Sequence, residues 1–369
     1  MEETVMTRKS IIMRILLFLV LTGLTAAALY CGTPMRRRYS ARGLHISLPA
    51  AKAEKAAKIV IRWRDVHTTL LLKNGRWVIE GRGSRPASVP RISALLNSLS
   101  TLAPVKQLHN VDRETLRQLR LIENDPKLIP GVGLSLYDVE NRELFNILLG
   151  KGHFVRPEPG RPSSGEAEGR YVLIDGKVYL LPVVFENCHP IPAVWVEPLR
   201  LYELRRALMM TSQRFENGKG RLLWSVFRKS TAHPFTLAYP IGKTAENQLL
   251  SGVAERLSNP FTMDYYIPEK DGKKPVFQHK LTIRCADGFS YELSVADGPA
   301  EYDIAALKVE YDPQKVLRIP GETDVQFRQR CEALRQRFEF ERGYSEGQYF
   351  KTKKKELGRM LEIIPEKIR

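Results

Sequence analysis

Residues 69–79 read TLLLKNGRWVI, two short strand-like runs on either side of the dipeptide Asn74-Gly75. A type I′ hairpin turn needs positive φ at both central positions, and Asn-Gly adopts this conformation readily. The stretch therefore predicts a β-hairpin. Strand-like runs also flank Asp175-Gly176 and Asp287-Gly288, so we expect antiparallel hairpins to form much of the fold.

Helical periodicity separates these hairpins. Between Ser88 and Leu102, apolar residues recur every three or four positions, which predicts a helix capped by Ser88. The stretch from Thr244 to Leu257 shows a similar stripe, again between predicted strands. Because strand, strand, helix and hairpin follow one another twice, we expect two related α+β units.

A further helix is expected at the end of the first unit, and two more in the C-terminal part of the chain. Residues 194–210 are expected to close the first unit as a helix. Residues 323–326 (TDVQ) fit a capping box that starts a long helix. A basic helix is expected over Lys353–Leu361. Two roles stay open for this C-terminal stretch, a solvated amphipathic tail and a contact with a partner or a membrane surface.

The N-terminal segment is the longest apolar run in the chain. Residues 15–31 read ILLFLVLTGLTAAALYC, and a bilayer core of about 30 Å needs about 20 apolar residues in a helix. The run extends back to Ile11 if Arg14 reaches towards the headgroups. We therefore predict one transmembrane anchor. Its principal lipid-facing residues are Ile15, Leu16, Leu17, Phe18, Leu19, Val20, Leu21, Leu24 and Leu29.

A cleaved signal peptide remains the alternative to a retained anchor. Residues 26–28 (AAA) offer a small-residue cleavage site, but apolar character continues past them to Cys31, which favours retention. Arginines lie on both sides of the segment, so the charge distribution gives no orientation.

The expected fold is α+β: a transmembrane helix, two related units of antiparallel hairpins packed with helices, and a helical tail. The N-terminal tail and anchor take residues 1–34, and a juxtamembrane linker takes 35–57. The first α+β unit spans 58–211 and the second 212–312. A basic helical tail covers 313–369.

The net charge of +17 and the sequence pI near 9.7 allow an anionic partner. The basic residues are spread along the chain, however, which favours a solvated or membrane-facing basic surface over a nucleic-acid site. The clusters expected to form this contact surface are Arg36, Arg37, Arg38, Lys353, Lys354 and Lys355.

The sequence contains no recognisable catalytic or metal-binding constellation. Its four cysteines form no C-x-x-C pair, and its histidines lack the spacing of a zinc helix. Cys188-His189 are sequence neighbours beside prolines, an arrangement typical of a structural turn. Buried thiols and one disulfide both stay open for Cys188, Cys285 and Cys331. We expect no cofactor, no metal and no enzymatic activity.

Residues 58–211 resemble the domain of unknown function called DUF4340. The resemblance lies in a lone N-terminal membrane helix, a hairpin carrying 75–79 (GRWVI), Pro86-Ala87 before a striped helix, and a hairpin from Tyr171 to Leu181 entered through Gly169-Arg170. It does not cover the C-terminal third of the chain, and it brings no catalytic residues.

The resemblance implies a single-pass protein of the bacterial inner membrane whose soluble region faces the periplasm. Some family members look like accessory components beside ABC-type export or gliding-related systems. We therefore expect a non-enzymatic scaffold or accessory subunit, with the lipid bilayer and membrane proteins as partners. The high positive charge supports an alternative, a binding module for an anionic ligand such as a polysaccharide, a lipid headgroup or nucleic acid.

Overall fold

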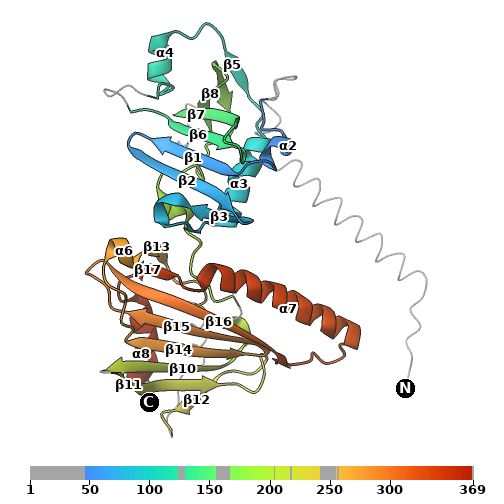
Figure 1. The fold of residues 1–369 in the computed structure, drawn as a ribbon, viewed down its shortest axis with the longest axis vertical. Helices are drawn as coiled ribbons and strands as arrows, with labels where there is room; N and C mark the ends of the chain where they lie inside the picture. Colours follow the sequence, from blue (N-terminus) through green and yellow to red (C-terminus); the bar gives the residue numbers. More distant parts are fainter. Residues whose placement is uncertain are drawn as a thin grey trace, which may run out of the picture. The chain divides into compact units, whose positions relative to one another are not determined.

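The computed structural model describes most of the chain from residue 46 onwards. The described residues are 46–123, 129–154, 167–202, 204–216, 218–241, 255 and 257–367. They form an α+β fold of two mostly antiparallel sheets with few helices (Figure 1). The predicted anchor at 15–31 lies outside these residues, and none of the helices described is both long and apolar enough to span a bilayer.

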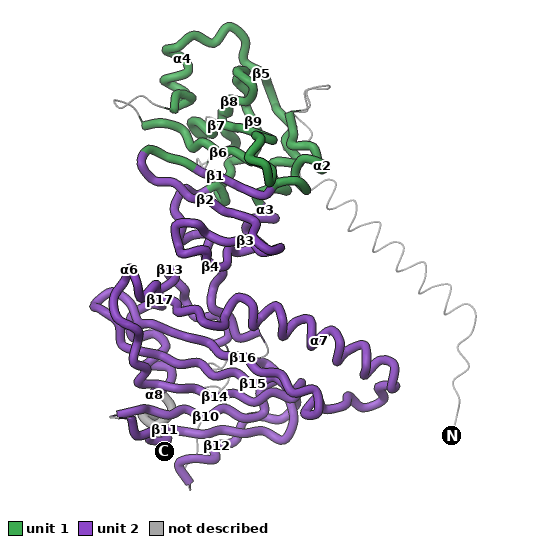
Figure 2. Tube along the Cα trace, in the orientation of Figure 1, with its two compact units in different colours: residues 1–56, 62–64, 95–188 green, residues 57–61, 65–94, 189–369 purple. Residues whose placement is uncertain are grey.

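The chain divides into two compact units (Figure 2). The first combines Met1–Ala56, Arg62–Arg64 and Leu95–Cys188, and the second combines Ala57–Ile61, Asp65–Ala94 and His189–Arg369.

The first sheet has nine strands in the order β4-β3-β2-β1-β6-β7-β8-β9-β5. The strands are β1 (Lys58–Trp63), β2 (Val66–Lys73), β3 (Arg76–Ile79), β4 (Arg85–Pro86), β5 (Lys106–Leu108), β6 (Val132–Tyr137), β7 (Glu143–His153), β8 (Gly169–Ile174) and β9 (Lys177–Leu181). The helices in this part of the chain are α2 (Ala50–Ala53), η1 (Glu80–Arg82), α3 (Val89–Ser100) and α4 (Arg113–Gln118).

Local turn chemistry explains these hairpins. Asn74 and Gly75 have φ values of 50° and 74°, and Leu72 pairs with Trp77 across the turn. Asp175 and Gly176 have the same left-handed conformation, with φ values of 48° and 73°. The predicted hairpins are therefore confirmed at both turns. The predicted helix stripe is confirmed as well, because Leu95 and Leu99 of α3 are fully buried.

The second sheet has eight strands in the order β12-β11-β10-β14-β15-β16-β17-β13. They are β10 (Ala207–Glu216), β11 (Lys219–Phe227), β12 (Thr236–Tyr239), β13 (Thr262–Tyr266), β14 (His279–Cys285), β15 (Asp287–Ala296), β16 (Tyr302–Val316) and β17 (Tyr349–Lys353). The helical segments of this part are η2 (Pro192–Trp195), η3 (Leu204–Arg206), α6 (Pro268–Asp271), α7 (Asp324–Ser345) and α8 (Glu356–Lys367).

The central strand order is the same in both sheets. The run β3-β2-β1-β6-β7-β8 of the first sheet corresponds to β12-β11-β10-β14-β15-β16 of the second. Each run begins with three consecutive strands that pair in sequence order. The next strand of the run, β6 or β14, then pairs with the first of these three, β1 or β10.

Helices α7 and α8 pack on one face of the second sheet. Met210 of β10, Ile283 of β14 and Tyr291 of β15 are direct neighbours in register and so share this face. The Tyr291 hydroxyl donates to Glu341 of α7 at 2.8 Å. Ser212, two residues after Met210, donates to the Leu361 carbonyl of α8 at 3.0 Å. We call the opposite side the open face of the second sheet.

Two predicted helices are wrong. The described residues of 194–210 are helical only in the short η2 and η3, and from Ala207 they belong to strand β10. Pro198 explains the first part, because a proline inside a helix lacks the amide donor and restricts the preceding residue. In the predicted basic helix, Lys353 ends strand β17 and the helix α8 starts only at Glu356. The C-terminal part is thus not purely helical.

The remaining helix predictions have mixed outcomes. The capping box is confirmed: Thr323 accepts from the Gln326 amide, and the Gln326 side chain accepts from the Thr323 amide. The predicted helix from Thr244 to Leu257 lies almost entirely outside the described residues. Only Glu255 and Leu257 of it are described, and both are helical.

Candidate functional site

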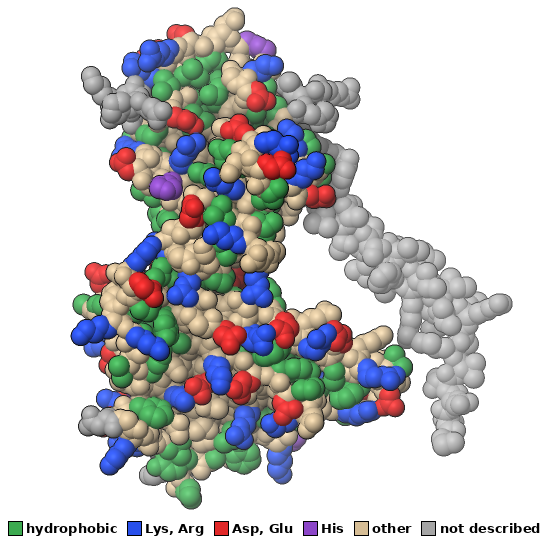
Figure 3. All heavy atoms as spheres, viewed as in Figure 1, with side chains coloured by type: hydrophobic (Ala, Val, Ile, Leu, Met, Phe, Trp, Pro, Cys, Tyr) green, Lys and Arg blue, Asp and Glu red, His purple; other side chains and the backbone are tan. Residues whose placement is uncertain are grey.

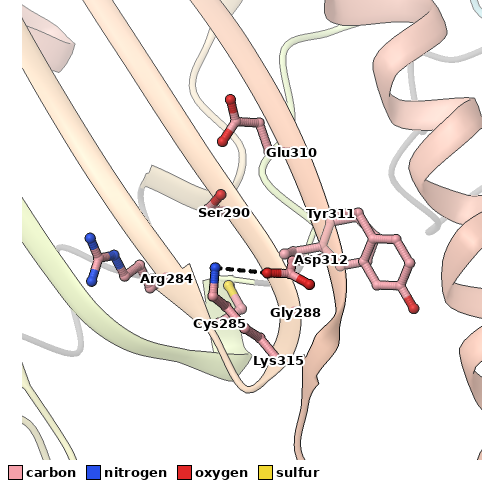
Figure 4. Close-up of a pocket in the computed structure, with 9 residues that line it drawn as sticks. Arg284, Cys285, Gly288, Ser290, Glu310, Tyr311, Asp312 and Lys315 are labelled. Carbon is pink, nitrogen blue, oxygen red and sulfur yellow. Dashed lines mark ion pairs between the residues drawn. The ribbon is translucent and has the colours of Figure 1, made fainter.

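A hollow of about 550 Å³ lies where β14 ends, β15 begins and β16 leaves its regular path (Figure 4). It belongs to the second unit. The residues that line it are Arg284, Cys285, Gly288, Phe289, Ser290, Glu310, Tyr311, Asp312 and Lys315.

Strand register places three of these side chains on the open face. Arg284 of β14 pairs with Ser290 of β15, and Ser290 pairs with Glu310 of β16. Each lies one residue along from a position that faces α7 or α8, and successive strand side chains point to opposite faces. Arg284 and Glu310 are exposed and Ser290 is half-buried, so the row crosses three strands at the solvent side.

A bulge in β16 forms another wall of the hollow. The β15–β16 register passes from Phe289↔Tyr311 directly to Asp287↔Val316, so residues 312–315 have no partners in β15. The Asp312 carboxylate closes this loop by accepting from the Gln314 amide at 3.0 Å and from the Lys315 ammonium at 2.8 Å.

Gly288 allows the bulge to approach β15. Its φ is +80°, and a Cβ added there would lie 2.3 Å from the Asp312 carbonyl oxygen. Any larger residue would meet both a left-handed backbone conformation and a backbone clash. Asp287 and Gly288 were expected to form a hairpin turn, but both lie in strand β15, where Gly288 helps to shape the hollow.

Two neighbouring ion pairs set the charge of this surface. Lys308 lies 2.7 Å from Glu310, and this hydrogen bond lowers the pKa of Glu310 and raises the pKa of Lys308. The hydrogen bond from Lys315 likewise lowers the pKa of Asp312. Both carboxylates are therefore ionised at neutral pH. Arg284 forms no ion pair with any residue that the structure describes.

The adjoining corner of the sheet is rich in arginine. The Arg228 guanidinium donates to the carbonyls of Ala207 and Arg205, which fixes the end of β11 against the start of β10. Arg206 lies 3.7 Å from the buried carboxylate of Asp287. In the space-filling view, basic and acidic side chains alternate over the visible surface of the second unit (Figure 3).

The first unit contains a second hollow of about 440 Å³. Its polar lining includes Glu123, Glu143, Asn146 and Asp175, above the apolar side chains of Leu121, Leu148 and Leu173. Among the described residues, no group of histidines, cysteines or carboxylates has the arrangement of a metal site. We regard the arginine-bearing hollow as the stronger candidate because it combines donors and acceptors.

The predicted basic contact surface stays a prediction. Lys353 and Lys355 are exposed, and Lys354 is 2.7 Å from Asp303 and also donates to the Gly298 carbonyl at 2.9 Å. The Lys354 ammonium thus has two partners within the fold. The cluster at 36–38 and the anchor residues lie outside the described part.

Cys188 is buried, and the backbone of His189 takes part in a hydrogen bond within the fold. Burial raises the pKa of the Cys188 thiol to about 12, and the His189 carbonyl accepts from the Trp195 indole at 2.8 Å. The thiol is therefore protonated at neutral pH. No disulfide joins the cysteines in the described residues.

Sequence reasoning missed Arg284, Ser290 and Glu310. Their alternation with apolar residues predicts an exposed strand face, and nothing local indicates that three strands align them. The one available signal was Asp312-Pro313, a turn dipeptide inside an otherwise strand-like run.

Comparison with known proteins gives no match: no family model, curated protein or solved structure is detectably similar to this chain. The resemblance to DUF4340 thus stays a prediction. The fold and the hollow define the chain only as an α+β protein with a mixed-charge surface on its second sheet.

Proposed function

We propose that this protein is a membrane-tethered binding protein of the bacterial envelope, acting as a scaffold or accessory subunit of a membrane complex. The observation that carries the proposal is the combination of an apolar segment at 15–31 with a solvated, charged open face on the second sheet. The segment would hold the chain at the bilayer, and the face would contact a membrane protein partner.

The chemistry of the open face supports a binding role. Lys280 and Glu292 pair across strands at 3.0 Å, and Lys308 and Glu310 pair at 2.7 Å. Exposed ion pairs contribute little to folding, about 0–1 kcal/mol each. Such a row supplies orientation and specificity at a protein interface more than it supplies stability.

The shared strand order of the two sheets supports a second element of the proposal. We take the two sheets as copies of one ancestral α+β unit that have since diverged. In this view the hollow is a feature acquired by the second copy, because Arg284, Gly288 and the 312–315 bulge all belong to it.

The resemblance to DUF4340 adds the cellular setting. It implies a tether in the inner membrane and an α+β region in the periplasm, beside an ABC-type transporter in some family members. A reporter fused after Arg369 that is active only in the periplasm tests this orientation. A cytoplasmic signal would contradict it.

Site-specific photo-cross-linking in native membranes tests the binding role. A photoreactive residue replaces Thr282, which lies beside Arg284 on the open face, and in a matched control it replaces Val139, 79% exposed at a turn of the first sheet. We expect a discrete adduct with a membrane protein from position 282 and none from 139. Absence of any adduct from 282, or identical adducts from both, would count against the proposal.

A further inference from the structure

The hollow on the second sheet has features of a small-molecule site that a protein-docking role does not require. We propose that it binds a small hydroxylated acid, a molecule with one carboxylate or phosphate group and several hydroxyls. Arg284 and Lys315 hold the anionic group, and Glu310 and Asp312 accept from the hydroxyls. This inference does not depend on the membrane tether or on a protein partner.

Arg284 supplies the principal anion contact. This residue is exposed, lines the hollow and has no ion-pair partner among the residues described. A guanidinium offers a planar fork of donors that matches the two oxygens of a carboxylate or phosphate. Ser290, its register neighbour, adds a hydroxyl within the same hollow.

Lys315 supplies a second cation that can turn towards a ligand. In Figure 4 its ammonium lies between Arg284 and Asp312 as seen in this view. The side chains of Lys315 and Asp312 are 76% and 40% exposed. Because solvent screens such a pair strongly, Lys315 can exchange Asp312 for a bound anion without leaving a buried charge behind.

The carboxylates restrict the ligand to a small molecule with a single anionic group. Glu310 and Asp312 are both ionised at neutral pH, and each lines the hollow. A polyanion such as nucleic acid would place further negative charge against them, which is repulsive. Ionised carboxylates are acceptors only, so they favour hydroxyl groups on the remainder of the ligand.

The surrounding corner attracts anions towards the hollow. The exposed side chains of Arg205 and Lys229 lie at this end of the sheet, close to the backbone contacts that Arg228 makes. A local excess of cations raises the concentration of anions near a site and speeds association. The cations of the corner attract any anion, and the donors and acceptors of the hollow select the ligand.

The bulge gives the hollow a defined shape. Residues 312–315 are held by the hydrogen bond from the Gln314 amide to the Asp312 carboxylate and by the close approach to Gly288. A backbone that is already in place needs little ordering when a ligand binds. The volume of about 550 Å³ is within the range of roughly 300–1,000 Å³ found for small-molecule sites.

Titration of the full chain in detergent micelles, at fixed ionic strength, tests the proposal. The probes are gluconate, glucose 6-phosphate, inorganic phosphate and neutral glucose, followed by saturation-transfer NMR and calorimetry. We expect saturable binding of gluconate or of glucose 6-phosphate, which separates a carboxylate from a phosphate ligand. Binding of glucose should be undetectable.

Matched variants distinguish binding in the hollow from general electrostatic attraction by the surrounding cations. We expect Arg284→Ala to weaken binding by about tenfold, as for loss of one charge-assisted contact, and Arg284→Lys to weaken it less. The control Arg205→Ala removes an exposed arginine of the same corner outside the hollow and should change affinity less than about twofold. Glu310→Gln should weaken gluconate binding more than phosphate binding.

Three results would overturn the proposal. Equal losses in Arg284→Ala and Arg205→Ala would show only a diffuse attraction of anions. Glucose binding as tightly as the acids would remove the role of the arginine. Absence of saturable binding by every probe, with circular dichroism of the Arg284 variants unchanged from wild type, would show that the hollow is not a site for this class.

Discussion

Replacing Gly288 with alanine tests the structural basis of the hollow. The left-handed φ of +80° disfavours an L-residue by about 1–2 kcal/mol. The added Cβ would also lie 2.3 Å from the Asp312 carbonyl oxygen, a backbone atom that cannot rotate away. Forcing a group into such a space typically destabilises by about 1–3 kcal/mol. We expect a total loss of roughly 2–5 kcal/mol, with displacement of the 312–315 bulge.

Gly321→Ala is the matched control for this change. Gly321 has a φ of +81°, nearly the same as Gly288, but nothing lies within 4 Å of an added Cβ. It should therefore lose only the conformational part, about 1–2 kcal/mol. Urea unfolding of the full chain in micelles gives both free energies, and hydrogen exchange over residues 302–316 reports on the bulge. Equal losses in the two variants, with unchanged exchange in β16, would refute the close contact.

Three further predictions concern the helices and core of the second unit. Tyr291→Phe removes a hydrogen bond to the buried Glu341 carboxylate and should lower the unfolding free energy by about 1.5–3 kcal/mol; a loss below the error of urea unfolding would contradict it. Thr323→Ala removes the capping box of α7 and should destabilise by about 1 kcal/mol, seen as faster hydrogen exchange in the first turn of α7, whereas an unchanged rate would argue against the cap. Burial lowers the pKa of His279 below its usual 6.5, so the unfolded chain binds the proton more readily; the stability due to the neutral ring is present above pH 6.5 and lost as the pH falls below it. His279→Gln should flatten this part of the pH–stability curve, and a curve identical to wild type would be the contrary result.

Hairpins and caps could be predicted from the sequence because their causes are local. The pair Asn74-Gly75 adopts positive φ at both positions, whatever the rest of the chain does. The capping box of Thr323 and Gln326 likewise needs only neighbouring residues. Predictions of this kind depend on contacts within a few positions, and the structure confirms them.

The failures arose where distant segments decide the outcome. Residues 207–210, predicted as the end of a helix, instead begin strand β10, because β11 and β14 pair on either side of it. Likewise, nothing in the sequence indicates that Lys354 pairs with Asp303, which is remote along the chain. The strand β17 was missed because its two neighbours, β13 and β16, are also remote.

The hollow shows the same division between local and distant causes. Asp287-Gly288 was predicted as a hairpin turn, but the turn lies at Ala286, both residues belong to β15, and of the two only Gly288 has a positive φ. Its role against Asp312 depends on the register of β15 with β16. The alignment of Arg284, Ser290 and Glu310 requires the order of three strands, which single-sequence periodicity does not give.

Membrane extraction of the full chain tests the central claim of the proposed function most directly. Membranes from cells that express the protein are washed at alkaline pH, which releases peripheral proteins and leaves spanning helices in place. We predict that the full chain stays in the membrane pellet and that a variant lacking residues 1–34 appears in the soluble fraction. Recovery of the full chain in the alkaline wash would contradict the tether at Ile15–Cys31.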